Sequence, residues 1–136
     1  MTTKQEKSSK PAAFIFGTRP ENITAPVKFL SVTGAFVDIP CQFKYRTRKE
    51  FSALWDKLAK PLGADQIQPE DFSFARLADR GLRHAAESTL EFLSDWPLEI
   101  ELNVDNIVRL FDEEPAAQEA FWNTYRLASN EGRLGN

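Results

Sequence analysis

The residues whose types could support catalysis or metal binding are few and scattered along this chain. One histidine, His84, and one cysteine, Cys41, are too few for a zinc site, which needs several convergent nitrogen and sulfur ligands. No Gly-x-Ser-x-Gly segment supplies a nucleophile that His84 could activate. The six glycines are dispersed, so neither a dinucleotide fingerprint nor a phosphate-binding loop is present. We therefore predict no catalytic residue, no metal site and no cofactor.

Carboxylates form short clusters that could in principle offer oxygen ligands to a hard cation. None of the clusters has the Asp-rich, Gly-centred spacing of a calcium loop. We interpret them as solvated acids at the surface or at helix ends. The clusters are Glu70-Asp71, Glu99 with Glu101, and Asp112 to Glu114.

A basic segment is the best candidate for contact with another macromolecule. Tyr45 lies within it, and cations interleaved with an aromatic ring are typical of single-stranded nucleic-acid contacts. The acidic isoelectric point of about 5.2 and the lack of a familiar DNA- or RNA-binding signature count against that function. A protein–protein contact is the favoured interpretation, and a small nucleic-acid-binding regulator is the alternative. The cations are Lys44, Arg46, Arg48 and Lys49.

Three tryptophans and eleven phenylalanines supply a core and also candidate anchors for a partner. Trp55 falls on the apolar stripe of its helix, so we expect it to be buried. Trp122 adjoins Phe121, and neighbours on a helix cannot face the same way, so one of the two lies toward a boundary. Such an aromatic residue either anchors a partner or packs under the N-terminal segment.

A strand pattern changes to a helix pattern at Thr47. Residues 37–45 alternate apolar with polar, as in a strand with one buried face, and this places Cys41 inside as an inert small hydrophobe. After Thr47, the apolar residues from Phe51 to Leu58 recur at helical spacing. Thr47 and Glu50 have the types and spacing of a capping box, which fixes the start of this helix.

The order of elements predicts an α+β fold, in which an N-terminal antiparallel hairpin or small sheet precedes about four packed helices. Residues 1–12 are expected to form a mobile tail and residues 13–136 a single domain. Phe14 to Phe16 is a short apolar run, and Gly17 to Pro26 carries turn formers. This segment is expected to be either a small edge strand or a loop that pins an aromatic residue to the core. Pro40 marks an edge or a bulge. The hairpin is expected at about 27–46, and helices at about 48–60, 82–95, 104–112 and 115–130, with a short helix opening near Pro69.

Charge is divided unevenly along the 136 residues. Residues 1–60 carry 11 basic and 5 acidic side chains, whereas residues 61–136 carry 6 and 15. This polarity either holds the halves of one domain together or lets copies associate head to tail. No apolar run approaches the ~20 residues that cross a bilayer, and the first ten residues lack the apolar segment of a secretory signal, so we expect a cytoplasmic protein.

Several of these segments, taken in order, resemble the tail assembly chaperones of long-tailed bacteriophages and their prophage relatives. The likeness covers roughly residues 25–136. It rests on the order and spacing of the segments and on the terminal Gly-Asn. The segments are Phe43 to Glu50, Trp96, Asn106 to Asp112, Glu114 to Ala117, Tyr125, and Glu131 to Asn136.

The resemblance implies a non-enzymatic protein of the bacterial host cytoplasm. Chaperones of this family coat the tape measure protein, keep it in solution and help to recruit the major tail tube protein. In many such phages a ribosomal frameshift also yields a longer product, and this chain would be the shorter one. By this resemblance, we expect client contact on helical faces near Phe111 and Trp122, with the segment from Arg46 to Lys49 aiding self-association.

Overall fold

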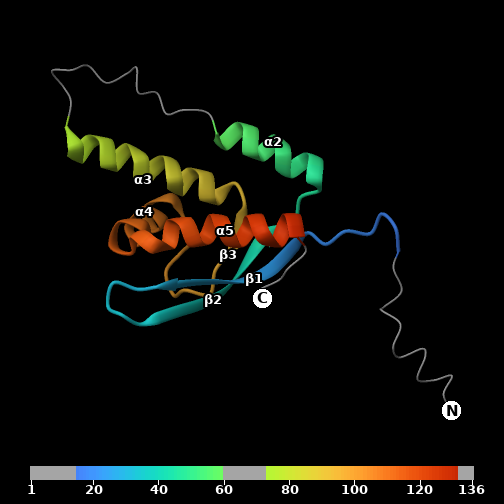
Figure 1. Cartoon of the computed structure of the whole chain (residues 1–136), viewed down its shortest axis with the longest axis horizontal. Helices are drawn as coiled ribbons and strands as arrows, with labels where there is room; N and C mark the ends of the chain where they lie inside the picture. Colours follow the sequence, from blue (N-terminus) through green and yellow to red (C-terminus); the bar gives the residue numbers. More distant parts are fainter. Residues whose placement is uncertain (1–14, 60–72, 132–136) are drawn as a thin grey trace, which may run out of the picture.

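A computed structural model of the chain describes residues 15–59 and 73–131 (Figure 1). Within these ranges, three antiparallel strands form one sheet in the order β1-β2-β3, and the fold is α+β, as predicted. The elements are β1 (Asn22–Leu30), β2 (Phe36–Lys44), α2 (Arg48–Leu58), α3 (Phe74–Leu90), β3 (Leu93–Asp95), α4 (Val104–Glu113) and α5 (Pro115–Glu131).

The β1–β2 hairpin is longer than the sequence pattern indicated. It pairs from Asn22 opposite Lys44 to Leu30 opposite Phe36, so β1 begins five residues before the expected start at Val27. Turn-forming residues are tolerated in β1 because Pro26 lies opposite Pro40. A proline pair fits a ladder where both nitrogens point away from the partner strand, so no donor is lost between the two strands.

Pro40 belongs to the central strand of the sheet, yet none of the described strands lies on the side of Pro40 away from β1. β3 pairs with β2 only around Gln42 and Phe43, where the register is irregular. The proline therefore lies beyond the end of β3, where β2 behaves as an edge strand. The sequence predicted an edge or a bulge at Pro40. β2 lacks a second neighbour at Pro40 among the described strands, and the register irregularity lies two to three residues later, between Gln42 and Phe43.

Two of the helix starts follow from their caps. Thr47 Oγ1 accepts a hydrogen bond from the Glu50 amide, while the Glu50 carboxylate accepts one from the Thr47 amide, which completes the capping box. The bond from the Thr47 backbone lowers the pKa of Glu50, with a smaller contribution from Arg19. Asn103 caps α4 through a hydrogen bond from the Asn106 amide.

The expected helix at 82–95 is wrong at both ends. α3 begins at Phe74 and ends at Leu90, and Leu93 to Asp95 instead form β3. Leu93 and Trp96 are buried residues that happen to continue the helical spacing, which misled the sequence interpretation. Gly81 lies inside α3. The expected tail over residues 1–12 and the short helix near Pro69 lie outside the described residues.

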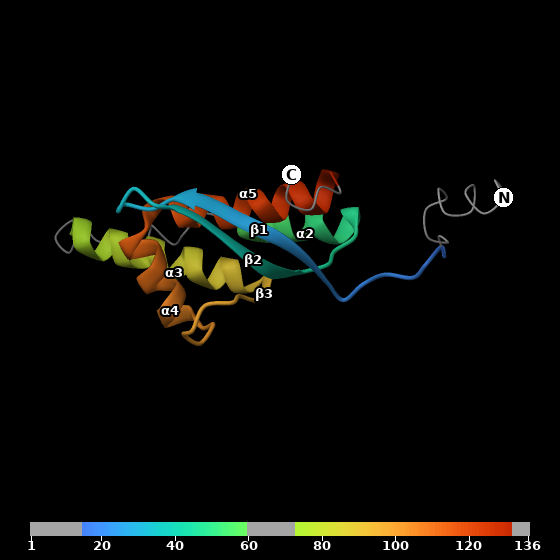
Figure 2. The same cartoon turned by 90° about the horizontal axis from the view of Figure 1, so that it is seen from below.

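The helices lie on one side of the hairpin (Figures 1 and 2). Inward-facing residues of β1 and β2, such as Val27 and Phe43, are fully buried, and so are Phe121 and Tyr125 of α5. Burial, and secondarily the charge of Asp95, raises the pKa of the Cys41 thiol to about 12, so Cys41 is an inert core residue.

Candidate interaction groove

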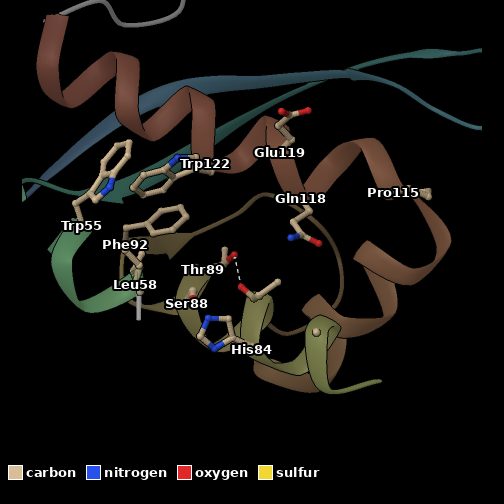
Figure 3. A pocket seen from close by; sticks show the side chains of 13 residues that line it. Trp55, Leu58, His84, Ser88, Thr89, Phe92, Pro115, Gln118, Glu119 and Trp122 are labelled. Atoms are coloured by element: carbon tan, nitrogen blue, oxygen red, sulfur yellow. Dashed lines mark hydrogen bonds between the residues drawn. The ribbon is translucent and has the colours of Figure 1, made fainter. Parts of the chain in front are cut away.

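An open groove of about 790 Å³ lies between α2, α3 and α5 (Figure 3). Its walls come from segments that are far apart in the sequence, so it exists only in the folded chain. We call this feature the aromatic groove. Its lining residues are Trp55, Leu58 and Ala59 around the end of α2; Gly81, His84, Ala85, Ser88 and Thr89 of α3; Phe92; and Pro115, Gln118, Glu119 and Trp122 of α5.

Aromatic rings form one end of the groove. The ring of Trp122 lies 5.3 Å from that of Trp55 and 5.4 Å from that of Phe92, both edge to face. Phe51 stacks on Trp122 from the core side at 5.8 Å. These contacts fix the orientation of the Trp122 ring, which is half-buried. The result is a rigid aromatic surface that needs little ordering when a partner binds.

Trp55 is exposed, contrary to the expectation that it would be buried. Its side chain retains 45% of its accessible surface. α2 contributes Phe51 and Leu54 to the core, and Trp55 follows one position later at the rim of the groove. A half-exposed tryptophan beside an aromatic cluster is the kind of residue that anchors a protein partner.

Small residues form the α3 wall. Gly81, Ala85 and Ser88 recur at helical spacing on one face of the helix. A Cβ atom built at Gly81 would meet nothing within 4 Å, so no contact with the described residues requires glycine at this position. Glycine inside a helix costs about 0.5–1 kcal/mol relative to alanine. Gly81 therefore leaves open space on this wall of the groove.

Five of the thirteen lining residues have polar side chains, namely His84, Ser88, Thr89, Gln118 and Glu119. Thr89 Oγ1 donates to the Ala85 carbonyl at 2.8 Å and is therefore used within α3. His84 lies on the same helix and also lines the groove (Figure 3). In residues 15–59 and 73–131, no cluster of three or more His, Cys, Asp or Glu side chains is arranged to hold a metal ion. The groove suits apolar contact.

The basic segment is divided by the fold. Arg46 is half-buried and donates to Tyr125 Oη at 3.0 Å and to the Glu91 carbonyl at 2.7 Å. Lys44 Nζ donates to the Leu90 carbonyl at 3.2 Å. Two of the four cations thus stabilise the fold. Arg48 and Lys49, in the first turn of α2, are exposed and make no such bond with the described part of the chain.

Phe111 and Trp122 have different environments. Phe111 is buried in α4 with its ring 5.9 Å from that of Phe121, so its side chain is not on a surface of the folded chain. Trp122 lines the aromatic groove. The sequence interpretation missed the exposure of Trp55 and the position of Gly81 in one wall of the groove. The one available signal was a glycine within an otherwise helical pattern.

The described helices include none whose length and apolar content would let it cross a membrane.

A family model described as phage tail assembly chaperone matches residues 12–136. The chain belongs to the phage tail assembly chaperone family. No curated protein and no solved structure matches it. Membership of this family indicates interaction with phage tail proteins. An open groove lined by aromatic residues is a surface suited to contact with a protein.

Proposed function

We propose that this tail assembly chaperone is a non-enzymatic protein of the bacterial host cytoplasm that binds the tape measure protein. Binding keeps the tape measure protein in solution and helps to recruit the major tail tube protein around it. The observation that carries the proposal is the aromatic groove in a chain of this family. In this proposal, the groove is the client-binding surface.

The shape of the groove favours a helical client segment. A binding helix would contact the small α3 wall at Gly81 and Ala85 and pack its apolar face against Trp55 and Trp122. This is how amphipathic helices bind in hydrophobic grooves. Glu119 of α5 is exposed and forms no ion pair in the described part of the chain. A cation on the client, next to its apolar face, would therefore be favoured there.

The expected affinity of one groove is modest. Fully burying an exposed large apolar side chain contributes about 1.5–3 kcal/mol to the free energy of binding. The entropy that the two proteins lose on association offsets much of this contribution. Weak contacts repeated by several chaperone molecules along a long client would hold it in solution and still allow tube subunits to displace them. This is the behaviour that assembly requires.

The nucleic-acid alternative loses support from the placement of the basic segment. Lys44 and Arg46 donate hydrogen bonds within the fold, which leaves Arg48 and Lys49 as the cations of that segment without such a bond among the described residues. Phosphate-driven binding would show as retention on DNA that falls steeply with salt. We expect no retention on duplex or single-stranded DNA at low ionic strength.

Co-expression with an otherwise insoluble fragment of the tape measure protein tests the proposal. The wild-type chain should keep the fragment in the soluble fraction, and Trp55→Ala should lose most of that effect. Ile100→Ala is the matched control, because the exposed fraction of Ile100, 41%, is similar to the 45% of Trp55, and Ile100 does not line the groove. Equal soluble yields with and without the wild-type chain would contradict client binding. Full activity of a folded Trp55→Ala variant would contradict the assignment of the groove.

A further inference from the structure

The outer face of the β1–β2 hairpin is uncovered in the described structure (Figure 2). Every second residue of each strand points away from the helices, and these residues are paired across the hairpin. From the turn inward, the pairs are Leu30 with Phe36, Lys28 with Asp38, Pro26 with Pro40, and Thr24 with Gln42.

The pair nearest the turn is apolar and exposed. Leu30 is 60% exposed and Phe36 is 68% exposed, and Val32 in the turn is 71% exposed. Isolated apolar residues on a surface need no explanation, but three together at the end of a hairpin form a patch. An exposed face on which large apolar side chains meet across the two strands is typical of an interaction surface.

Glu114 holds this patch in place. Its carboxylate accepts a hydrogen bond from Ser31 Oγ at 2.8 Å and another from the Val32 amide at 3.0 Å. Ser31 N also donates to the Ala35 carbonyl at 2.8 Å, which closes the turn. The hairpin end is therefore fixed against the α4–α5 junction before any partner arrives, and binding orders little additional chain.

The next pair carries opposite charges that are not joined to each other. Lys28 and Asp38 lie opposite one another in register, both are exposed, and neither belongs to an ion pair among the described residues. One cation and one anion therefore lie side by side next to an apolar pair. A face with this arrangement is electrostatically complementary to a second copy of itself.

We propose that the outer faces of two hairpins stack on each other to form a symmetric dimer. Consider a two-fold axis that runs parallel to the strands, midway between β1 and β2 and above the outer face. This axis would place each β1 residue of one copy opposite a β2 residue of the second copy, namely the residue with which it pairs inside its own hairpin. Lys28 would then face Asp38 of the second copy, and Leu30 would pack on Phe36 of the second copy. All these contacts follow from one symmetry operation, because each pair is complementary to itself.

Pairing through the strand edge is less favourable than stacking of faces. Pro26 lies at the middle of β1, opposite Pro40, with its nitrogen directed away from β2. A chain that approached the free edge of β1 would find no donor there. The segment from Arg46 to Lys49 is also a weaker choice than the sequence suggested, because Arg46 is bonded to Tyr125 and Glu91 within the fold.

Two charge-reversed variants test the dimer. We expect the wild-type chain to be dimeric by light scattering and sedimentation, and K28D and D38K each to raise the dimer dissociation constant by about tenfold or more, because like charges then face each other. Mixing the two variants should restore a dimer, because the doubly acidic hairpin of K28D would face the doubly basic hairpin of D38K. Mixing changes no monomer, so restoration cannot come from improved folding.

The outcomes are decisive in both directions. A monomeric wild-type chain, dimers of unchanged strength in the single variants, or variants that stay monomeric when mixed would each overturn the proposal. F36S, which removes apolar contact without changing charge, should weaken the dimer as well, and thermal unfolding would show that it folds. None of these measurements involves a client, so they do not depend on whether the aromatic groove binds the tape measure protein.

Discussion

Arg46 and Tyr125 are joined by a hydrogen bond of 3.0 Å between the guanidinium and the phenolic oxygen. The Tyr125 hydroxyl donates in turn to the Lys44 carbonyl at 3.0 Å, and Arg46 also donates to the carbonyl of Glu91. These bonds connect the end of β2, the end of α3 and the middle of α5. Arg46 is therefore a structural residue in a segment that looked like a surface patch.

Replacing Arg46 with alanine should lower the free energy of unfolding by about 2–4 kcal/mol. Hydrogen bonds to charged groups contribute about 1.5–3 kcal/mol each, and the change leaves the Glu91 carbonyl without its donor. Urea unfolding would measure the effect. Arg48→Ala is the control, and it should change stability by no more than about 0.5 kcal/mol, because Arg48 is exposed. Similar effects of the two substitutions would contradict the assigned role of Arg46.

Substitution of Gly81 should separate stability from client binding. Gly81→Ala should raise the free energy of unfolding by about 0.5–1 kcal/mol, because a Cβ atom there meets nothing within 4 Å and alanine favours a helix. Gly81→Leu should fold equally well but fill the groove and prevent client binding. Ala75→Leu is the control for the same helix, since Ala75 does not line the groove. Undiminished binding by Gly81→Leu would argue against a groove-bound client.

Two neighbouring glutamates should differ in their contribution to the hairpin. Glu114→Ala removes the acceptor for Ser31 and Val32, so we expect a loss of about 1–3 kcal/mol and faster hydrogen exchange at the Val32 amide. Glu113→Ala breaks only an exposed ion pair with Arg109, which is worth about 0.3–0.5 kcal/mol. If exchange at Val32 were the same in both variants, Glu114 would not be holding the turn.

The raised pKa of Cys41 predicts that the free energy of unfolding falls at alkaline pH. Its thiol has a pKa of about 12 in the folded chain, raised from an ordinary value near 9 by burial. Below about pH 9 both states keep the proton and the full contribution is present. As pH rises from about 9 toward 12, the unfolded chain loses the proton first, so stability falls. The decline should be steeper in the wild-type chain than in Cys41→Ala, and equal slopes in urea unfolding would exclude this cause.

Local signals in the sequence were enough for much of the fold. The capping box at Thr47 and Glu50, the cap at Asn103 and the proline at the start of α5 each act within one turn of a helix, so they could be identified without tertiary information. β3 could not, because its three residues form a strand only through pairing with β2. Propensity in so short a segment is overridden by tertiary contacts.

The candidate site was also hard to predict, because it too depends on contacts between segments that are far apart in the sequence. The exposure of Trp55 depends on how α2 lies relative to α3 and α5, and the internal bonds of Arg46 depend on Tyr125, which is 79 positions away. Neither is encoded in a local pattern. The position of Trp122 next to the buried Phe121 did indicate a boundary residue, because adjacent helical residues face different ways.

The indole resonances of the three tryptophans test the client-binding groove most directly. Trp55 and Trp122 line the groove, whereas Trp96 is buried elsewhere with its Nε1–H donated to the Ile100 carbonyl at 2.9 Å. In a nitrogen–proton correlation spectrum, a helical peptide from the tape measure protein should shift the indole signals of Trp55 and Trp122 and leave that of Trp96 in place. Binding that leaves the Trp55 and Trp122 signals unmoved would contradict the account.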